Sequence, residues 1–225
     1  MITLLIDVVS NNSIIALISQ KESEIIGKIK LNSDQMHSEN IVPSLESLIS
    51  TSGYSYPDIK NIICITGPGN YTNIRTGVAV AKCISVVNDI DAYGLTQHEL
   101  IADTYHYPND SNTLTVITHS INNEFYYQAF EKNAPIQEDP IILSSDEILS
   151  SVTLSGNSLV ETGNEFRNYL IRNNVSIKNL ISNYLVPDKM LSKICTTSTL
   201  RQVNLSAKYI KTPKLIKYKK RDIYE

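Results

Sequence analysis

A pair of strand-like segments occurs twice in this 225-residue chain. Residues 5–19 (LIDVVSNNSIIALIS) align with residues 116–130 (VITHSINNEFYYQAF) at a constant offset, and the pairs Asn11-Asn12 and Asn122-Asn123 coincide. Asn tolerates positive φ, so each pair indicates a hairpin turn. A third apolar segment follows each pair, EIIGKIKL at 24–31 and DPIILS at 139–144. This repetition predicts an α/β chain of two related lobes, each a strand meander followed by helices and strands.

The first lobe can be read element by element. Residues 2–7, 13–19 and 24–31 are predicted strands. The spacing of apolar residues over 41–49 predicts a helix capped by Ser38 or Asn40. A strand at 62–66, a helix at 73–88, a strand at 91–94 and a helix at 96–104 follow, and the polar segment 105–112 reads as a linker. The predicted division is therefore 1–106 and 107–225.

Gly67-Pro68-Gly69 lies between a predicted strand and a predicted helix. Both glycines can adopt the positive φ of a sharp turn, and Thr72 is a plausible N-cap. A helix N-terminus can also bind phosphate. However, the segment has neither the spacing nor the Lys of a phosphate-binding P-loop. We therefore expect a structural turn at Gly67, Pro68 and Gly69.

The helix predicted at 73–88 is apolar almost all round. Its only charged residues are Arg75 and Lys82, seven positions apart on one narrow face. A surface helix normally has a single apolar stripe, so this one should be covered on two sides. The sheet can cover one side of the helix. The other side could be covered by a second layer of the same chain or by a partner subunit, and the sequence leaves both possibilities open. Gly77 and Ala81 would let another helix approach closely, beside the apolar residues of the helix at 41–49.

Composition and motifs exclude several functions. The formal net charge is only −3, and the N-terminus reads as a strand rather than a signal peptide. No apolar run reaches the roughly 18–20 residues of a membrane helix, so we expect a cytoplasmic protein that does not bind membranes. No two His residues are four apart, as a helical metal site requires, and no G-x-S-x-G elbow occurs. We expect no catalytic residue and no metal ligand.

Several of these segments resemble the bacterial TsaB (YeaZ) family of tRNA threonylcarbamoyladenosine biosynthesis. The matching pieces are Leu5-Ile6-Asp7, His37-Ser38 with Pro43, residues 67–75 (GPGNYTNIR), residues 94–102 (GLTQHELIA) and residues 207–211 (AKYIK). The resemblance is strong over 1–104 and faint beyond. It implies a two-lobed, duplicated actin-like (ribonuclease-H-like, ASKHA) fold.

The resemblance also implies a function. A member of this family would be a non-catalytic subunit that binds the catalytic subunit TsaD and the ATPase TsaE, and supports threonylcarbamoyl transfer to an adenosine beside the tRNA anticodon. It would need no cofactor of its own, since the assembled complex uses the ATP. Its first two helices would meet TsaD or a second copy of the chain. The expected interface residues are Ile41, Leu45, Leu48, Ile49, Thr72, Arg75, Gly77, Val78 and Ala81.

The chain departs from the family pattern at three places. Val8-Val9 replaces Thr-Ser after Asp7, Thr118-His119 stands where the second lobe has Asp-Ala, and His98 replaces Leu. The alternative function is an ATP-dependent phosphotransferase, a small-molecule kinase of the same fold. Such a kinase needs a carboxylate in each lobe near the metal-bound phosphates. Only Asp7 is present, which would leave a degenerate nucleotide site or a simple turn cap.

The C-terminus is basic, since residues 208–225 carry seven Lys or Arg and two acidic residues. Tyr209 and Tyr218 lie among the lysines. A basic segment with interleaved aromatics can contact tRNA phosphates, and the alternative is a solvated tail. The candidate RNA contacts are Lys211, Lys214, Lys217, Lys219, Lys220 and Arg221.

Overall fold

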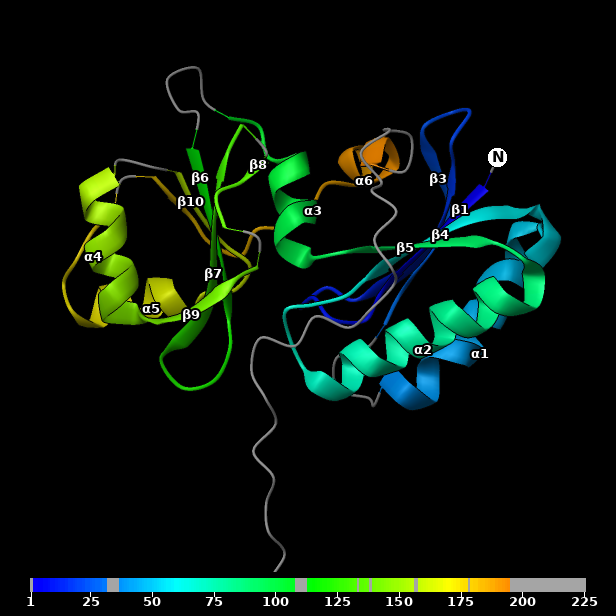
Figure 1. Cartoon of the computed structure of the whole chain (residues 1–225), viewed down its shortest axis with the longest axis horizontal. Coiled ribbons are helices and arrows are strands. Elements are labelled where there is room, and N and C mark those ends of the chain that lie inside the picture. The colour runs from blue at the N-terminus through cyan, green and yellow to red at the C-terminus, as the bar shows by residue number, and fades with distance from the viewer. Residues whose placement is uncertain are drawn as a thin grey trace, which may run out of the picture.

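The computed structural model describes residues 2–31, 37–107, 113–132, 134–137, 139–155, 158–177 and 179–194. The chain forms two lobes, each built on one mixed β-sheet, with helices on the outside and between them (Figure 1). The two-lobed arrangement predicted from the repeat is confirmed.

The sheet of the first lobe has five strands. In space they run β3 (Glu24–Lys30), β2 (Ile14–Ser19), β1 (Ile2–Asp7), β4 (Ile59–Ile65) and β5 (Asp91–Leu95). β1, β2 and β3 form an antiparallel meander, whereas β4 and β5 run parallel to β1. Every residue of β1 and β2 is buried, which explains their almost continuous apolar sequence.

The second lobe repeats this strand order. β9 (Ile141–Ser144), β7 (Glu124–Glu131), β6 (Thr113–His119), β10 (Ser158–Glu161) and β11 (Leu180–Ile181) occupy the places of β3, β2, β1, β4 and β5. A short strand, β8 (Ala134–Pro135), pairs with the far end of β7 and has no counterpart in the first lobe. The internal repeat therefore extends to the whole sheet, beyond the strands that the sequence alignment matched.

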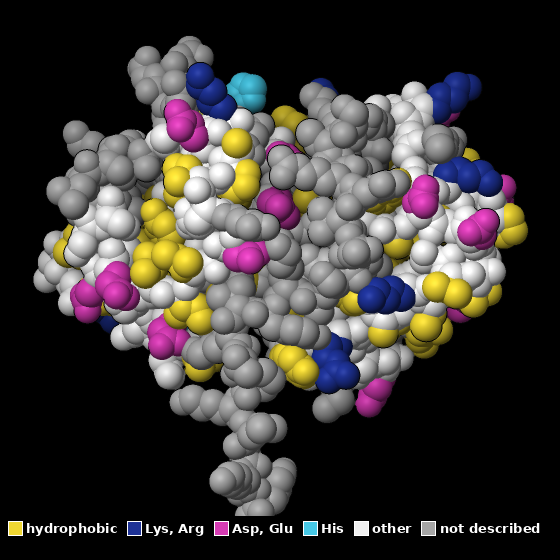
Figure 2. Space-filling view, in the orientation of Figure 1, with side chains coloured by type: hydrophobic (Ala, Val, Ile, Leu, Met, Phe, Trp, Pro, Cys, Tyr) yellow, Lys and Arg dark blue, Asp and Glu magenta, His cyan; other side chains and the backbone are white. Residues whose placement is uncertain are grey.

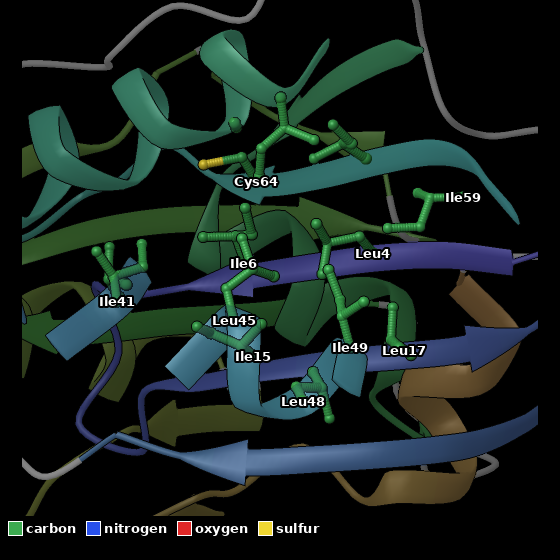
Figure 3. Packing of buried hydrophobic residues seen from close by; sticks show 14 of the residues in the cluster. Leu4, Ile6, Ile15, Leu17, Ile41, Leu45, Leu48, Ile49, Ile59 and Cys64 are labelled. Carbon is green, nitrogen blue, oxygen red and sulfur yellow. The ribbon is translucent and has the colours of Figure 1, made fainter. Parts of the chain in front are cut away.

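Two helices cover the outer face of the first sheet. They are α1 (His37–Ser52) and α2 (Tyr71–Asn88), which also contact each other. A single-turn 3-10 helix, η1 (Tyr56–Asp58), leads from α1 into β4. In Figure 3 the labelled side chains of α1 point toward those of β1 and β2. Leu45 and Leu48 of α1 share one cluster with Ile6 and Leu17 of the sheet. This cluster is the main core of the first lobe.

Helices α3 (Gln97–Thr104) and α6 (Asp188–Ile194) lie on the inner side of the lobes (Figure 1). Leu100 of α3 and Leu191 of α6 pack with Leu5 and Ile63 of the first sheet. Ile101, on the next position of α3, packs with Val116 and Phe130 of the second sheet, among others. α3 therefore joins the two cores, and α6 crosses back from the second half of the chain to the first lobe. The division at 106/107 stays a prediction.

Two further helices cover the outer face of the second sheet. α4 (Ser145–Ser155) and α5 (Glu165–Arg172) contribute Ile148 and Phe166 to a cluster with Ile117 and Phe125. The rings of Phe125 and Phe166 meet edge to face with centroids 5.6 Å apart. The first lobe thus has α1 and α2 on its outer face, and the second has α4 and α5.

Candidate functional site

The turn between β4 and α2 lies where Gly67, Pro68 and Gly69 were expected to form it. Gly67 has a φ of 129°, a region that favours glycine. A Cβ on Gly69 would lie 2.5 Å from Val9 Cγ1, so a side chain there would collide with the β1–β2 turn. The N–H of Gln97 donates to Gly67 O at 2.7 Å. The turn therefore packs against the β1–β2 turn and is tied to the start of α3.

The N-terminus of α2 is closed by its own cap. The helix begins at Tyr71, and Asn70 Oδ1 accepts from the N–H groups of Thr72 at 3.0 Å and Asn73 at 3.2 Å. The predicted cap at Thr72 is therefore wrong by two residues. The helix begins two residues earlier than the sequence predicted, so the capped N–H groups are those of Thr72 and Asn73 and not those that follow Thr72.

Asp7 ends β1 and serves the turn that follows. Its Oδ1 accepts from the N–H groups of Val9 and Ser10, both at 3.0 Å, and Ser10 Oγ donates to its Oδ2. The carboxylate is buried. These contacts are those of a turn cap, one of the two roles that the sequence left open for Asp7.

The equivalent position of the second lobe, Thr118, faces the first lobe. Its Oγ1 lies 3.0 Å from Nε2 of His98, which is fully buried on α3. Burial lowers the pKa of His98 to about 3, although an interaction with Gln128 acts in the opposite direction. A neutral imidazole therefore joins α3 to the sheet of the second lobe. The sequence did not reveal this contact, since His98 was noted only as a departure from the family's Leu.

Glu161 is a second buried ionisable residue that the sequence analysis missed. It ends β10, and its carboxylate accepts from the N–H groups of Phe166 at 2.6 Å and Arg167 at 3.2 Å. Burial raises its pKa, and these hydrogen bonds act in the opposite direction. Glu161 therefore closes the N-terminus of α5 as Asn70 closes that of α2. The sequence feature that could have indicated this cap is the single acidic residue, Glu161, at the end of the short strand Ser158–Glu161.

A cavity of about 310 Å³ opens between the lobes. The β1–β2 turn, the Gly67–Gly69 turn and the first residue of α3 form one side. The other side is formed by the ends of β6 and β10. Amide and hydroxyl side chains dominate the lining, and among the described residues neither Lys nor Arg contributes to it.

Seven of the nine expected interface residues are buried in the core of the first lobe. Figure 3 labels four of them: the α1 side chains that point toward the sheet. On α2, a Cβ on Gly77 would lie 2.7 Å from Val8 Cγ2, so this face of the helix touches the sheet. The interface assignment does not hold for Ile41, Leu45, Leu48, Ile49, Gly77, Val78 and Ala81. At these positions the chain's own sheet is the cover, and only Thr72 and Arg75 are exposed.

The opposite side of α2 nevertheless carries exposed apolar residues. Val86 and Val87 are each 81% exposed, and Ala79 and Cys83 are exposed beside them. Figure 2 shows hydrophobic side chains gathered over the face formed by α1 and α2. We define the outer face of α2 as the exposed residues Thr72, Arg75, Ala79, Lys82, Cys83, Val86 and Val87. The helix thus has the second apolar side predicted from its sequence, carried by different residues.

The remaining candidate residues fall elsewhere. The basic residues from Lys211 to Arg221 lie outside the described residues. Across the described helices, none is long and apolar enough to cross a membrane. In the part of the chain that the structure describes, no three His, Cys, Asp or Glu residues gather to hold a metal ion.

Comparison with known proteins adds sequence and fold relationships. Residues 24–153, more than half of the chain, match the family model of TsaD, the tRNA N6-adenosine threonylcarbamoyltransferase. The chain is 29% identical over 93 residues to the tRNA threonylcarbamoyladenosine biosynthesis protein TsaB of Bacillus subtilis, covering 41% of each chain. It is 22% identical over 97 residues to the Escherichia coli protein of that name, covering 43% of this chain and 42% of that protein. The matches thus span less than half the length of these two relatives.

The fold has a solved counterpart. YeaZ from Pseudomonas aeruginosa superposes with a TM-score of 0.65 at 14% sequence identity, covering 86% of this chain and 89% of that one. Together with the duplicated strand order, this places the chain in the two-lobed actin-like fold.

Proposed function

Because the chain belongs to the TsaB (YeaZ) family, within the TsaD-like domain family that its sequence matches, we propose that it acts in tRNA threonylcarbamoyladenosine biosynthesis. In this proposal it is a non-catalytic subunit that supports threonylcarbamoyl transfer to the tRNA adenosine by binding the catalytic subunit TsaD. A second copy of the chain is the alternative occupant of the same surface, and the ATPase TsaE joins the assembled complex. The protein works in the cytoplasm.

The observation that carries the proposal is the outer face of α2. Val86 and Val87 are largely exposed on a helix whose other side is fully used by the sheet. Soluble proteins rarely leave contiguous apolar patches uncovered unless the patch binds something. Arg75 lies over the ring of Tyr71 at the start of this face, 5.3 Å from its centroid, and supplies a polar margin. A partner helix would complete the cover that α2 lacks.

Charged substitutions on this face test the proposal. Ala79→Glu and Val86→Glu should weaken association with co-expressed TsaD about tenfold or more, because each buries an unpaired charge at the interface. Circular dichroism and the melting temperature should stay unchanged, since both side chains are exposed. The matched control is Ile171→Glu, an exposed apolar residue on α5 of the other lobe. Size-exclusion chromatography that shows an intact complex with both α2 variants would refute this use of the face.

The absence of catalysis is part of the same proposal. Sugar kinases of this fold must present free backbone N–H groups and paired carboxylates to a nucleotide. Here the N–H groups of Val9 and Ser10 are bonded to Asp7, those of Thr72 and Asn73 to Asn70, and those of Phe166 and Arg167 to Glu161. This capping supports a chain with no nucleotide cofactor of its own and disfavours the kinase alternative.

ATP turnover by the purified chain tests that second part. We expect no hydrolysis above a blank, with or without Mg²⁺. Metal-dependent turnover that disappears in Asp7→Ala would instead favour the phosphotransferase.

The basic C-terminal segment remains a prediction within this proposal. If Lys211, Lys214, Lys217, Lys219, Lys220 and Arg221 contact tRNA, removing residues 212–225 should weaken tRNA binding by the assembled complex and lower its salt dependence. Unchanged binding at every salt concentration would assign the segment no RNA role.

A further inference from the structure

The cavity between the lobes has an unusual chemical lining. Apart from Val9, Leu31 and the Pro68-Gly69 turn, its walls consist of amides, hydroxyls, one imidazole and one carboxylate. The amides are Asn11, Asn70, Asn73 and Gln97, and the hydroxyls are Ser10, Ser13, Thr118, Ser120 and Thr162. Its volume of about 310 Å³ lies at the lower end of the roughly 300–1,000 Å³ typical of small-molecule sites.

Two lining side chains keep unused hydrogen-bonding capacity. Gln97, from the first lobe, and Thr162, from the second, are only 6% and 5% exposed. Among the described residues, neither the Gln97 amide nor the Thr162 hydroxyl forms a hydrogen bond within the protein, although their backbone N–H groups do. Buried polar side chains are normally paired with protein or water, so these two groups on one cavity are available to a ligand that enters it. The Gln97 amide and the Thr162 hydroxyl can each donate a hydrogen bond to a ligand and accept one from it.

The charges around the cavity restrict that partner. Among the described residues that line the cavity, the only Asp, Glu, Lys or Arg is Glu165, a carboxylate. The N–H groups at the start of α2 and α5 are already bonded to Asn70 and Glu161. In the described part of the chain, an anionic group would therefore meet the negative charge of Glu165, and the N–H groups of Thr72, Asn73, Phe166 and Arg167 would already be used. The lining favours an uncharged molecule with many hydrogen-bonding groups.

We infer that the interlobe cavity binds an uncharged, hydroxyl-rich small molecule, with Gln97 contacting it from the first lobe and Thr162 from the second. A nucleoside and a sugar share this chemistry. Both carry adjacent hydroxyls that pair with amide and hydroxyl side chains, and both have an apolar ring face that fits against Val9 and Leu31. The cavity is lined by Asn70 and Asn73 at the N-terminal end of α2, whereas the exposed Val86 and Val87 of the outer face of α2 lie near the C-terminal end of the helix.

Isothermal titration calorimetry of the full chain tests the inference with three probes: adenosine, glucose and ATP with Mg²⁺. We expect adenosine or glucose to bind with a dissociation constant of about 1 mM or tighter, and ATP to bind at least about tenfold more weakly than the better of them. Binding of adenosine alone would identify a nucleoside site, and binding of glucose alone a sugar site. No binding by either neutral probe, or ATP binding as tightly as the better one, would overturn the inference.

Two substitutions locate the site. Gln97→Leu and Thr162→Val remove the hydrogen-bonding groups at nearly constant volume, and each should weaken binding of the better probe about tenfold, as the loss of one good hydrogen bond would. Asn168→Leu, which removes an exposed amide on α5, should leave binding of that probe unchanged.

The melting temperature of each variant is measured first to show that it folds. If Gln97→Leu does not fold, the test rests on Thr162→Val alone. Wild-type affinity in the folded variants would place the ligand elsewhere and overturn the inference. The measurement needs no partner protein, so its failure would leave the proposed docking role intact.

Discussion

At Gly77 the backbone of α2 lies close to the first sheet. A Cβ there would meet Val8 Cγ2 at 2.7 Å, and Val8 is fully buried and cannot easily move away. The sequence predicted that another helix approaches Gly77 and Ala81, whereas the close neighbours of Gly77 are Val8 and residues of the chain's own sheet. The identity of the approaching surface was not predictable, because periodicity shows which residues share a face and not what covers that face.

Gly77→Ala should therefore destabilise the protein by about 1–2 kcal/mol. Overpacking against a rigid side chain costs about 1–3 kcal/mol and outweighs the roughly 1 kcal/mol gained in helix propensity. Chemical denaturation measures the change. In a Val8→Ala background, which removes Cγ2, the same substitution should become neutral or stabilising. An equal cost in both backgrounds would contradict the contact.

His98 predicts a specific dependence of stability on pH. Its pKa is about 3 in the folded chain and near 6.5 when unfolded, so it is neutral in both states above pH 7. As the pH falls below 6.5, the unfolded chain binds a proton that the folded chain does not, and stability decreases. Between pH 7 and pH 5 this one group should cost roughly 2 kcal/mol.

His98→Gln, which does not titrate, should remove that part of the acid sensitivity. The measurement is denaturant unfolding at both pH values. The exposed His106→Gln serves as the control and should behave as the wild type. If His98→Gln loses as much stability between pH 7 and pH 5 as the wild type, His98 is not held neutral in the folded protein.

At the scale of elements, the strands of the first lobe were predicted closely. The predicted strands at 2–7, 13–19 and 24–31 correspond to β1, β2 and β3 within one residue at each end. These segments are bounded by turn residues, and β1 and β2 have an almost continuous apolar sequence. Prediction was less accurate where polar residues belong to an element. α1 extends to residues 37–52 around the apolar core at 41–49, and β4 begins at Ile59 rather than 62.

The interlobe cavity was not predictable at this scale. Its two sides come from turns about 100 residues apart, and Gln97 and Thr162 belong to different lobes. The sequence placed Asp7 and Thr118 at equivalent strand ends, but the contact of Thr118 with His98 depends on how α3 packs between the sheets. Such a contact follows from tertiary packing and leaves no local pattern.

Helix α6 is held on the first lobe mainly by apolar burial. Leu191 is buried with Leu5 and Leu100, whereas the Lys28–Asp188 ion pair, at 2.6 Å, is exposed to solvent. Leu191→Ala should cost about 2–4 kcal/mol because it leaves a cavity. Asp188→Asn should cost less than about 1 kcal/mol, since exposed ion pairs contribute little. Thermal or urea unfolding of both variants compares the two, and a larger loss from Asp188→Asn would reverse this assignment.

At the scale of the molecule, the two lobes share their helices. α3 contributes Leu100 to one core and Ile101 to the other, and α6 returns from the second half of the chain to cover the first sheet. The repeat in the sequence predicted two similar lobes but gave no sign of this exchange, because the helices carry no feature that assigns them to one sheet.

Heat should therefore unfold the lobes together. Calorimetry should give one transition whose van't Hoff and calorimetric enthalpies agree, despite the two sheets. Ile101→Ala, at the contact with the second lobe, should move that single transition to lower temperature without splitting it, at a cost of about 2–4 kcal/mol. Two resolved transitions in either protein would mean that the lobes unfold separately.

The late position of α6 also affects how the protein is made. A ribosome delivers β1 through α3 long before residues 188–194, and domains generally fold as they emerge. While nearly the entire second lobe is synthesised, α6 is not yet available to the first lobe. The sheet surface around Leu5 is therefore incompletely covered during that time. During that interval the nascent chain exposes an apolar surface of the kind that molecular chaperones bind. A stalled or truncated product that ends before Leu191 would keep that surface permanently and be a substrate for proteolysis.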